Sequence, residues 1–186
     1  MAGKLAGKFK TIVIDPPWHG PNASPAFQAH APLRVLPYST MTGIAIASLQ
    51  VPQLAHPKAQ LWIWAGSRGL GDAQLLLQQW SFNYRALFVW DKSGRKNGKW
   101  RIGTGRHMRG QCEFLLWGGR PGAQMVRPSD CPSQLQEWPV PRRHSEKPGE
   151  AYQLIRSMSA APRVDLFARQ RRPGFQSWGN ELAAQG

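Results

Sequence analysis

A carboxylate followed by two prolines and a tryptophan is the feature of this 186-residue sequence best suited to chemistry. In Asp15-Pro16-Pro17-Trp18, the first proline restricts Asp15 to an extended backbone, and neither proline has an N–H that could compete for an acceptor. Asp15 is therefore expected to be a rigidly held hydrogen-bond acceptor beside a flat aromatic ring. This combination suits an enzyme that binds a planar, amine-bearing base. The alternative is a strand-ending turn with a surface Asp and a half-buried Trp.

The residues directly before Asp15 predict the element that positions it. Ile12, Val13 and Ile14 are β-branched and apolar, which indicates a short buried parallel strand over residues 10–14. Open α/β sheets bind their ligands at the carboxyl ends of the strands. Asp15 is thus expected at the edge of a sheet where ligands bind.

The rest of the chain alternates between strand and helix patterns. Strands are expected at residues 59–65, 82–90, 113–117 and 163–168, and helices at 42–49, 70–80 and 148–158, the first with Thr42 as its N-cap. Residues 120–143 are Pro-rich and expected to be irregular. The alternation predicts an α/β fold with a mostly parallel central sheet and helices on both faces.

One domain is expected over residues 10–186, after a flexible basic leader at residues 1–9. Within the domain, residues 19–37 and 91–110 are expected to be mobile loops at the active site and the nucleic-acid surface. Residues 91–110 hold seven Lys or Arg and five Gly, with Trp100 among them. A cationic loop with an aromatic ring can follow phosphates and stack on a base. A solvated loop is the alternative.

The charge balance indicates a polyanionic partner. There are 24 Lys and Arg against 10 Asp and Glu, a net charge of +14, which is expected of a nucleic-acid binder. A solvated basic surface without a partner is the alternative. No run of eighteen apolar residues and no signal-peptide core are present, so a cytoplasmic protein without a membrane partner is expected. Cys112 and Cys131 lack metal-binding spacing, so no metal is expected.

Several separate stretches together resemble the N6-adenine methyltransferases that carry an Asp-Pro-Pro-Trp motif. That family includes the eukaryotic messenger-RNA adenosine methyltransferase and small phage and bacterial DNA-adenine relatives. The similar stretches occur in the family's order between about residues 10 and 182. They are Asp15-Pro16-Pro17-Trp18, Tyr38-Ser39-Thr40-Met41, the strands around Trp64 and Trp90, Glu113-Phe114-Leu115-Leu116, His144-Ser145-x-Lys147-Pro148, Leu166-Phe167-Ala168-Arg169 and Trp178-Gly179-Asn180-Glu181.

The resemblance implies a Rossmann-like fold, S-adenosylmethionine as methyl donor, and methylation of the exocyclic N6 amine of adenine. Asp15 and a backbone carbonyl of the Pro–Pro turn, that of Pro16, would accept the two N–H groups of the amine while it attacks the methyl group. Trp18 would stack on the base, a contact that contributes roughly 1–3 kcal/mol. Asp15, Pro16, Pro17 and Trp18 are therefore the expected catalytic residues.

The resemblance also implies that the donor is bound by residues late in the chain. Lys147, with Ser145 nearby, would contact the methionine part, and Arg169 would help to hold the ribose and adenine. Asp165 would orient Arg169. Without the resemblance, Lys147 would be interpreted as a helix-entry lysine and Arg169 as a cation at the sheet edge. The complete expected donor site is Ser145, Lys147, Asp165, Phe167, Arg169, Arg172, Asn180 and Glu181.

Nucleic acid is the expected second substrate, and DNA is favoured because the chain is as minimal as the phage and bacterial relatives. The expected contact residues are cationic or aromatic: Tyr38, Lys96, Lys99, Trp100, Arg106, His107, Arg109, Arg142 and Arg143. A monomer or homodimer is expected. Three alternatives stay open: an RNA adenosine N6-methyltransferase, a non-catalytic nucleic-acid-binding subunit on the same fold, and a methyltransferase for the N4 amine of cytosine.

Overall fold

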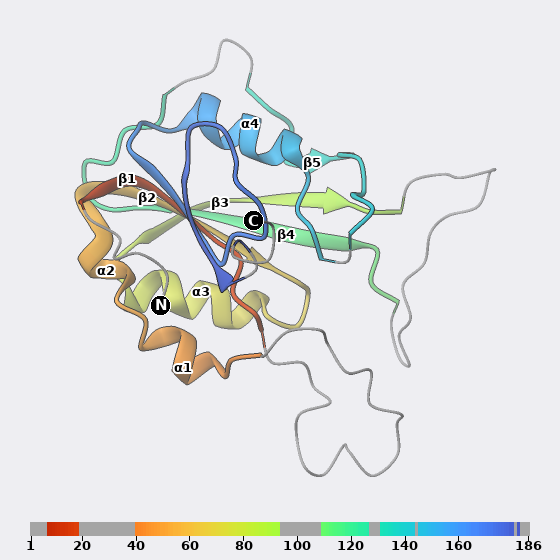
Figure 1. Cartoon of the computed structure of the whole chain (residues 1–186), viewed down its shortest axis with the longest axis horizontal. Helices are drawn as coiled ribbons and strands as arrows, with labels where there is room; N and C mark the ends of the chain where they lie inside the picture. Colours follow the sequence, from red (N-terminus) through yellow and green to blue (C-terminus); the bar gives the residue numbers. More distant parts are fainter. Residues whose placement is uncertain are drawn as a thin grey trace.

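The computed structural model describes residues 7–18, 40–93, 109–126, 131–143, 145–180 and 182. These residues form a seven-stranded sheet with the order β5-β3-β4-β2-β1-β6-β7 (Figure 1). The strands are β1 (Phe9–Ile14), β2 (Ala55–Ala65), β3 (Asn83–Asp91), β4 (Cys112–Gly119), β5 (Leu135–Gln136), β6 (Arg163–Leu166) and β7 (Gln176–Trp178). The helices are α1 (Gly43–Ala47), α2 (Val51–Leu54), α3 (Leu70–Gln79) and α4 (Gly149–Met158).

The sheet is mostly parallel, as predicted. β1 pairs in parallel with both β2 and β6, β6 pairs in parallel with β7, and β3 pairs in parallel with β5. β4 is the exception among the strands of the described ranges, because it runs antiparallel to both of its neighbours, β2 and β3. The first residues of β4 therefore lie at the same edge of the sheet as the last residues of β1 and β2.

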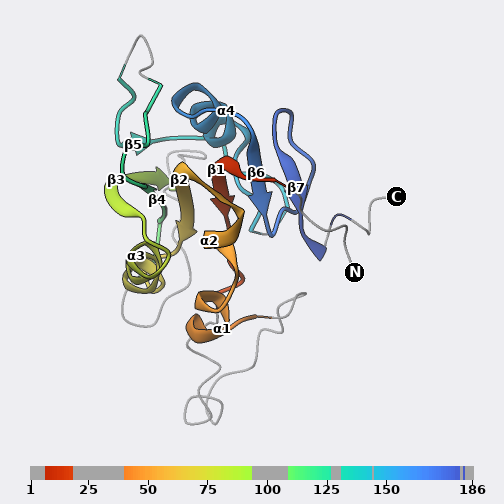
Figure 2. The same ribbon diagram turned by 90° about the vertical axis from the view of Figure 1, so that its left-hand side faces the viewer.

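Helices cover both faces of the sheet, which confirms the predicted Rossmann-like α/β arrangement (Figure 2). Side chains alternate between two apolar clusters: Ile12 and Ile14 of β1 pack on the side of α1, α2 and α3, whereas Val13 packs on the side of α4. Trp62 and Trp64 of β2 join the α4-side cluster and are fully buried. Complete burial of an apolar side chain stabilises the fold by about 1.5–3 kcal/mol. The buried side chains of β1 and β2 therefore hold these two strands rigidly.

Several element boundaries differ from the predictions. Thr42 is the N-cap of α1, and its Oγ1 accepts the N–H of Ala45 at 3.2 Å, but α1 ends at Ala47. The strand predicted over residues 163–168 ends at Leu166, because Phe167 adopts a left-handed φ of 60°. β5 lies within the segment predicted to be irregular, and α2 and β7 were not predicted. Within the ranges that the structure describes, no helix is both long and apolar enough to cross a membrane.

β3 and β4 stay joined beyond their last ladder pair. Asp91 pairs with Cys112, and the N–H of Lys92 then donates to the carbonyl of Gln111 at 2.7 Å. The ends of the predicted 91–110 loop are thus fixed to each other. Residues 94–108 of that loop, the whole of the predicted 19–37 loop, and residues 1–6 of the predicted leader lie outside the described residues.

Candidate active site

Asp15 lies directly after β1, at the carboxyl end of a central strand. Its N–H donates to the carbonyl of Leu166 in β6 at 3.4 Å, and 13% of its side-chain surface is exposed. The chain then turns tightly, because the N–H of Trp18 donates to the carbonyl of Pro16 at 2.7 Å. The carbonyl of Pro17 accepts the N–H of Met41 at 2.8 Å. The rigid turn expected from the two prolines is therefore present and tied to neighbouring segments.

The indole ring of Trp18 is held from two sides. Its Nε1 donates to the carbonyl of Trp64, near the end of β2, at 2.8 Å. Gly69, in the turn between β2 and α3, packs against the ring so closely that a Cβ there would lie 3.3 Å from it. The ring is half-buried, and part of it faces the cavity described next.

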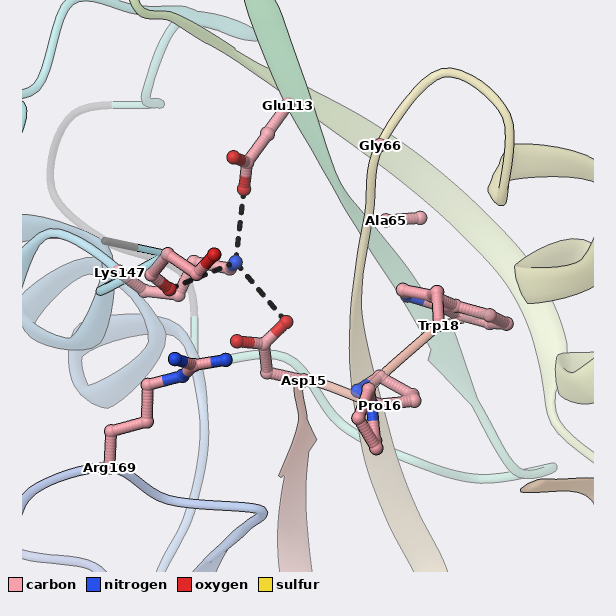
Figure 3. A pocket seen from close by; sticks show the side chains of 10 residues that line it. Asp15, Pro16, Trp18, Ala65, Gly66, Glu113, Lys147 and Arg169 are labelled. Carbon is pink, nitrogen blue, oxygen red and sulfur yellow. Dashed lines mark hydrogen bonds and ion pairs between the residues drawn. The ribbon is translucent and has the colours of Figure 1, made fainter. Parts of the chain in front are cut away.

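A cavity of about 170 Å³ opens at this edge of the sheet (Figure 3). Its lining comes from the turn after β1, the end of β2, the start of β4, the segment before α4 and the segment after β6. The lining residues are Asp15, Pro16, Pro17, Trp18, Ala65, Gly66, Glu113, Ser145, Lys147 and Arg169. It thus brings together all four expected catalytic residues and three of the expected donor residues. No group of His, Cys, Asp and Glu side chains that could hold a metal ion occurs among the described residues.

Four side chains of alternating charge are connected at the cavity, and three of them line it. Lys147 Nζ lies 3.2 Å from Asp15 Oδ1 and 3.0 Å from Glu113 Oε2, between the two carboxylates (Figure 3). It also donates to the carbonyl of Ser145 at 3.5 Å. Lys92 Nζ contacts the other oxygen of Glu113 at 2.5 Å. Lys147 is only 9% exposed, and a buried ammonium is tolerated where partners on both sides offset the cost of leaving water.

The pKa shifts follow from burial and from these contacts. Burial raises the pKa of Asp15, and the lowering by the Lys147 ammonium does not offset it. Burial also raises the pKa of Glu113, but the attraction of Lys147 and Lys92 outweighs it, so that pKa is lowered. Burial lowers the pKa of Lys147, and its two carboxylate partners raise it further than burial lowers it. Asp15 is therefore a more basic acceptor than an ordinary aspartate, beside a cation that stays charged at neutral pH.

Glu113 is a site residue that the sequence predictions missed. It was expected as the first residue of a strand and within the Glu113-Phe114-Leu115-Leu116 stretch that resembles the family, but it was given no role at the site. It lies at the cavity because β4 is antiparallel, with Phe114 paired to Ala65 at the end of β2. A carboxylate next to a buried apolar run, in a chain with only ten acids, was the available signal. The direction of the strand, which decides where Glu113 lies, has no local signature.

The other expected donor residues that the structure describes are not part of the cavity lining. Asp165 is 1% exposed, accepts the hydroxyl of Tyr152 at 3.2 Å, and has a pKa raised by burial to about 7. Phe167 packs edge-on against Trp178, with ring centroids 5.6 Å apart. Arg172 donates to the carbonyl of Lys147 at 2.7 Å. Asn180 is exposed, and Glu181 lies outside the described residues.

The expected nucleic-acid residues fall into two groups. Arg109, Arg142 and Arg143 are described; all three are exposed, and none lines the cavity. The other six lie outside the described residues: Tyr38, Lys96, Lys99, Trp100, Arg106 and His107. Contact between any of the nine and a nucleic acid stays a prediction.

Two backbone conformations at the site are unusual for residues other than glycine. Ser145 and Phe167 have left-handed φ values of 60°, one shortly before Lys147 and the other shortly before Arg169. Such conformations cost about 1–3 kcal/mol each and persist where the surroundings enforce them. Near Phe167, Gly179 crosses Ala168 so closely that a Cβ on the glycine would lie 2.2 Å from the alanine carbonyl oxygen. The turn after β6 is thus enforced by packing.

Comparison with known proteins supports the resemblance to the N6-adenine methyltransferases. A Medicago truncatula protein described as N(6)-adenosine-methyltransferase MT-A70-like is 28% identical over 96% of this chain. The type II methyltransferase M.MunI of Mycoplasma sp is 28% identical over 78% of the chain, and the human N(6)-adenine-specific methyltransferase METTL4 is 27% identical over 94%. The aligned regions span 27%, 60% and 37% of these three proteins, respectively, which is less than two thirds of each.

A family model also matches most of the chain. The model named MT-A70 covers residues 9–181, from the start of β1 to the residue after Asn180. This range contains the Asp-Pro-Pro-Trp turn, Glu113, Lys147 and Arg169, and therefore every residue of the cavity wall. The sequence resemblance is thus confirmed: the chain belongs to the MT-A70 family.

Proposed function

We propose that this protein transfers a methyl group from S-adenosylmethionine to the N6 amine of adenine in DNA. The observation that carries the proposal is the position of Asp15, a buried and unusually basic carboxylate in a cavity that it shares with the Pro–Pro turn and Trp18. Membership of the MT-A70 family supports the reaction type. The three relatives are all described as methyltransferases, two of them specific for an N(6) position.

The residues of the cavity fit the proposed donor. When bound, S-adenosylmethionine supplies an electrophilic methyl group on a sulfonium, and its methionine part carries a carboxylate. Lys147, with Ser145 beside it, would hold that carboxylate, since the Lys147 ammonium lies in the cavity wall and stays charged at neutral pH. Arg169 lines the same cavity, and Asn180 follows β7. These two residues would hold the ribose and adenine.

The proposed acceptors for the target amine are Asp15 and the carbonyl of Pro16, and both residues line the cavity. Asp15 would accept one N–H of the amine, and its raised pKa makes it the stronger acceptor as positive charge develops on nitrogen. The Pro16 carbonyl has two lone pairs, of which the N–H of Trp18 occupies one. The second would accept the other N–H. The part of Trp18 that faces the cavity would stack on the base.

DNA is proposed ahead of RNA on the ground of one relative, because the charge of the chain does not distinguish the two. The net charge of +14 suits a polyanion of either kind, and the M.MunI relative, of which 60% is aligned, is a type II methyltransferase. RNA is the second candidate, because another relative is described as an adenosine methyltransferase. A non-catalytic role is disfavoured by the intact cavity wall, in which Asp15 and Lys147 are paired.

The test is transfer of labelled methyl from S-adenosylmethionine to matched DNA and RNA oligonucleotides, with each product digested to nucleosides. Wild type is expected to form N6-methyldeoxyadenosine. Asp15→Asn is expected to lose about 10²–10³-fold in kcat, the usual effect of removing one group that stabilises developing charge. Asp72→Asn is the matched control, because Asp72 is an exposed acid on α3. Product from RNA alone would favour the second candidate. Methylated cytosine, or no donor binding at all, would refute the proposal.

A further inference from the structure

The backbone of Lys147 is held by a residue 25 positions further along the chain. Arg172, in the connection between β6 and β7, donates from Nη2 to the carbonyl of Lys147 at 2.7 Å. Lys147 directly precedes Pro148, the N-cap of α4. A Cβ added at the next residue, Gly149, would lie 3.9 Å from Arg172 Nη1. Arg172 therefore fixes the point where the chain enters α4 and from which the Lys147 side chain extends into the cavity.

Arg172 is itself held by an aromatic and acidic cluster. Its guanidinium carbon lies 3.8 Å from the centre of the Tyr152 ring on α4. The hydroxyl of Tyr152 donates to Asp165 of β6 at 3.2 Å, and Phe175 packs edge-on against the same ring with centroids 5.4 Å apart. Tyr152 is 6% exposed. The orientation of the guanidinium is thus set by α4 and β6 together.

Only arginine can make both contacts at once. Its guanidinium is planar, so one face can stack on an aromatic ring while an N–H at the edge donates in the plane. A lysine at this position keeps the positive charge but is a point donor on a flexible stem. The two contacts of Arg172, to the Tyr152 ring and to the Lys147 carbonyl, therefore depend on the shape of the group and not on its charge alone.

We propose that Arg172 is a positioning residue for Lys147. It holds the Lys147 backbone so that the ammonium reaches between Asp15 and Glu113, 3.2 and 3.0 Å from their oxygens. The resemblance implies a donor contact for Arg172, which stays a prediction; in the structure its guanidinium contacts the Lys147 carbonyl and the Tyr152 ring. The consequence for methyl transfer rests on the proposed function. The effect on the titration of Asp15 does not rest on the proposed function, and it can be measured in the protein without donor or nucleic acid.

The charged groups that act on Asp15 define the readout. Lys147 and Arg169 lower its pKa, and Glu113 raises it. The buried Asp165 of β6 also interacts electrostatically with Asp15, and Arg172 lowers the pKa of Asp165. A shift that persists without Lys147 would therefore come through Asp165. Arg172 is not a direct neighbour of the Asp15 carboxylate; its contact is with the Lys147 backbone. If Arg172 positions Lys147, its loss weakens the Lys147–Asp15 pair, and Asp15 titrates at a higher pH.

The experiment is a carbon-13 NMR titration of the aspartate carboxyls in the free protein. The chain has five aspartates, so the Asp15 signal is assigned by its absence in Asp15→Asn. Arg172→Met and Arg172→Lys are both expected to move the Asp15 titration to higher pH. Arg171→Met is the control, since it removes an exposed arginine at the neighbouring position. Thermal unfolding checks that each variant is folded, and Arg172→Lys serves if Arg172→Met is not.

The charge-retaining variant decides between positioning and simple charge loss. If Arg172→Lys titrates like wild type, the proposal is overturned, because the lysine preserves the charge and loses the shape. In a Lys147→Met background, Arg172→Lys is expected to cause no further shift, since its effect acts through Lys147. A full additional shift there would also refute it.

A second readout connects the positioning to the donor. S-adenosylmethionine is expected to bind about tenfold more weakly to Arg172→Lys than to wild type, with Arg171→Met unchanged, as expected for the loss of a charge-assisted hydrogen bond. If wild type binds no donor, the proposed function fails while the titration still tests the positioning. If the donor binds equally to Arg172→Lys and wild type while the Asp15 titration is unchanged, the positioning fails alone.

Discussion

Replacing Lys147 by methionine should be among the most damaging single changes to the cavity wall. The ammonium lies 3.2 Å from Asp15 and 3.0 Å from Glu113. At an effective dielectric constant of about 20, each pair is worth roughly 5 kcal/mol of attraction before the cost of burying the charges is subtracted. Removing one partner of a buried pair typically costs about 3–5 kcal/mol, because the remaining charges stay uncompensated. We expect a loss of about 3–5 kcal/mol in unfolding free energy for Lys147→Met at pH 8.

The loss should depend on pH in a defined direction. Without Lys147, the carboxyls of Asp15 and Glu113 lose the ammonium between them, and their pKa values rise in the folded state. When the pKa of a carboxyl is higher in the folded state than in the unfolded state, the folded protein becomes less stable as the pH rises from the unfolded pKa to the folded pKa. The pKa of Lys147 itself is raised in the wild type, so its own charge is constant from pH 5 to 8. The variant should therefore be closer to wild type at pH 5 than at pH 8.

Urea unfolding, followed by tryptophan fluorescence, gives the unfolding free energy at pH 5 and at pH 8. It therefore measures both the loss caused by Lys147→Met and the pH dependence of that loss. Lys10→Met is the matched control, since Lys10 is an exposed lysine on β1, and we expect it to stay within about 0.5 kcal/mol of wild type at both values. The reasoning is refuted if Lys147→Met matches this control at pH 8, or if its loss is greater at pH 5.

Two further changes test the support beneath the site. Gly179→Ala places a Cβ 2.2 Å from the Ala168 carbonyl oxygen and must separate the two segments, so we expect a loss of about 1–3 kcal/mol and a lower thermal midpoint. Gly71→Ala, on α3 with no atom within 4 Å of the added Cβ, should be neutral or stabilising, and equal midpoints for both alanine variants would contradict this argument. Asp165, whose pKa is about 7 when folded, is expected to destabilise the wild type by up to roughly 4 kcal/mol as pH rises from about 4 to 7, because the folded state binds the proton more tightly. The stability of Asp165→Asn relative to wild type should therefore increase over that range in urea unfolding, and a constant difference would show that Asp165 does not titrate as described.

The features that were predicted from the sequence are those that depend on neighbouring residues. The β-branched run before Asp15 identified β1, and the two prolines identified the turn that ends it. Thr42 was recognised as an N-cap because its side chain acts only three residues away, on Ala45. α4 likewise lies within the range predicted for it, residues 148–158.

The features that were missed depend on distant residues. β5 and β7 have two and three residues, too few for a hydrophobic pattern, and they exist because longer strands offer them an open edge. The antiparallel direction of β4 arises from pairing with β2 and β3, and with it the position of Glu113. The contact of Arg172 with Lys147 spans 25 residues and requires α4 and β6 to be in place.

The junction between β3 and β4 has a consequence for how such proteins can diversify. The chain leaves the sheet at Lys92 and returns at Gln111, and these two residues are hydrogen-bonded to each other at 2.7 Å. Closing a loop on a fixed base becomes only about 0.6 kcal/mol more costly for each doubling of its length. Insertions, deletions or exchanges of the intervening segment can therefore accumulate while Glu113 keeps its place in the cavity wall and its contact with Lys92. The length of this connection is thus energetically decoupled from the geometry of the sheet edge that carries Glu113.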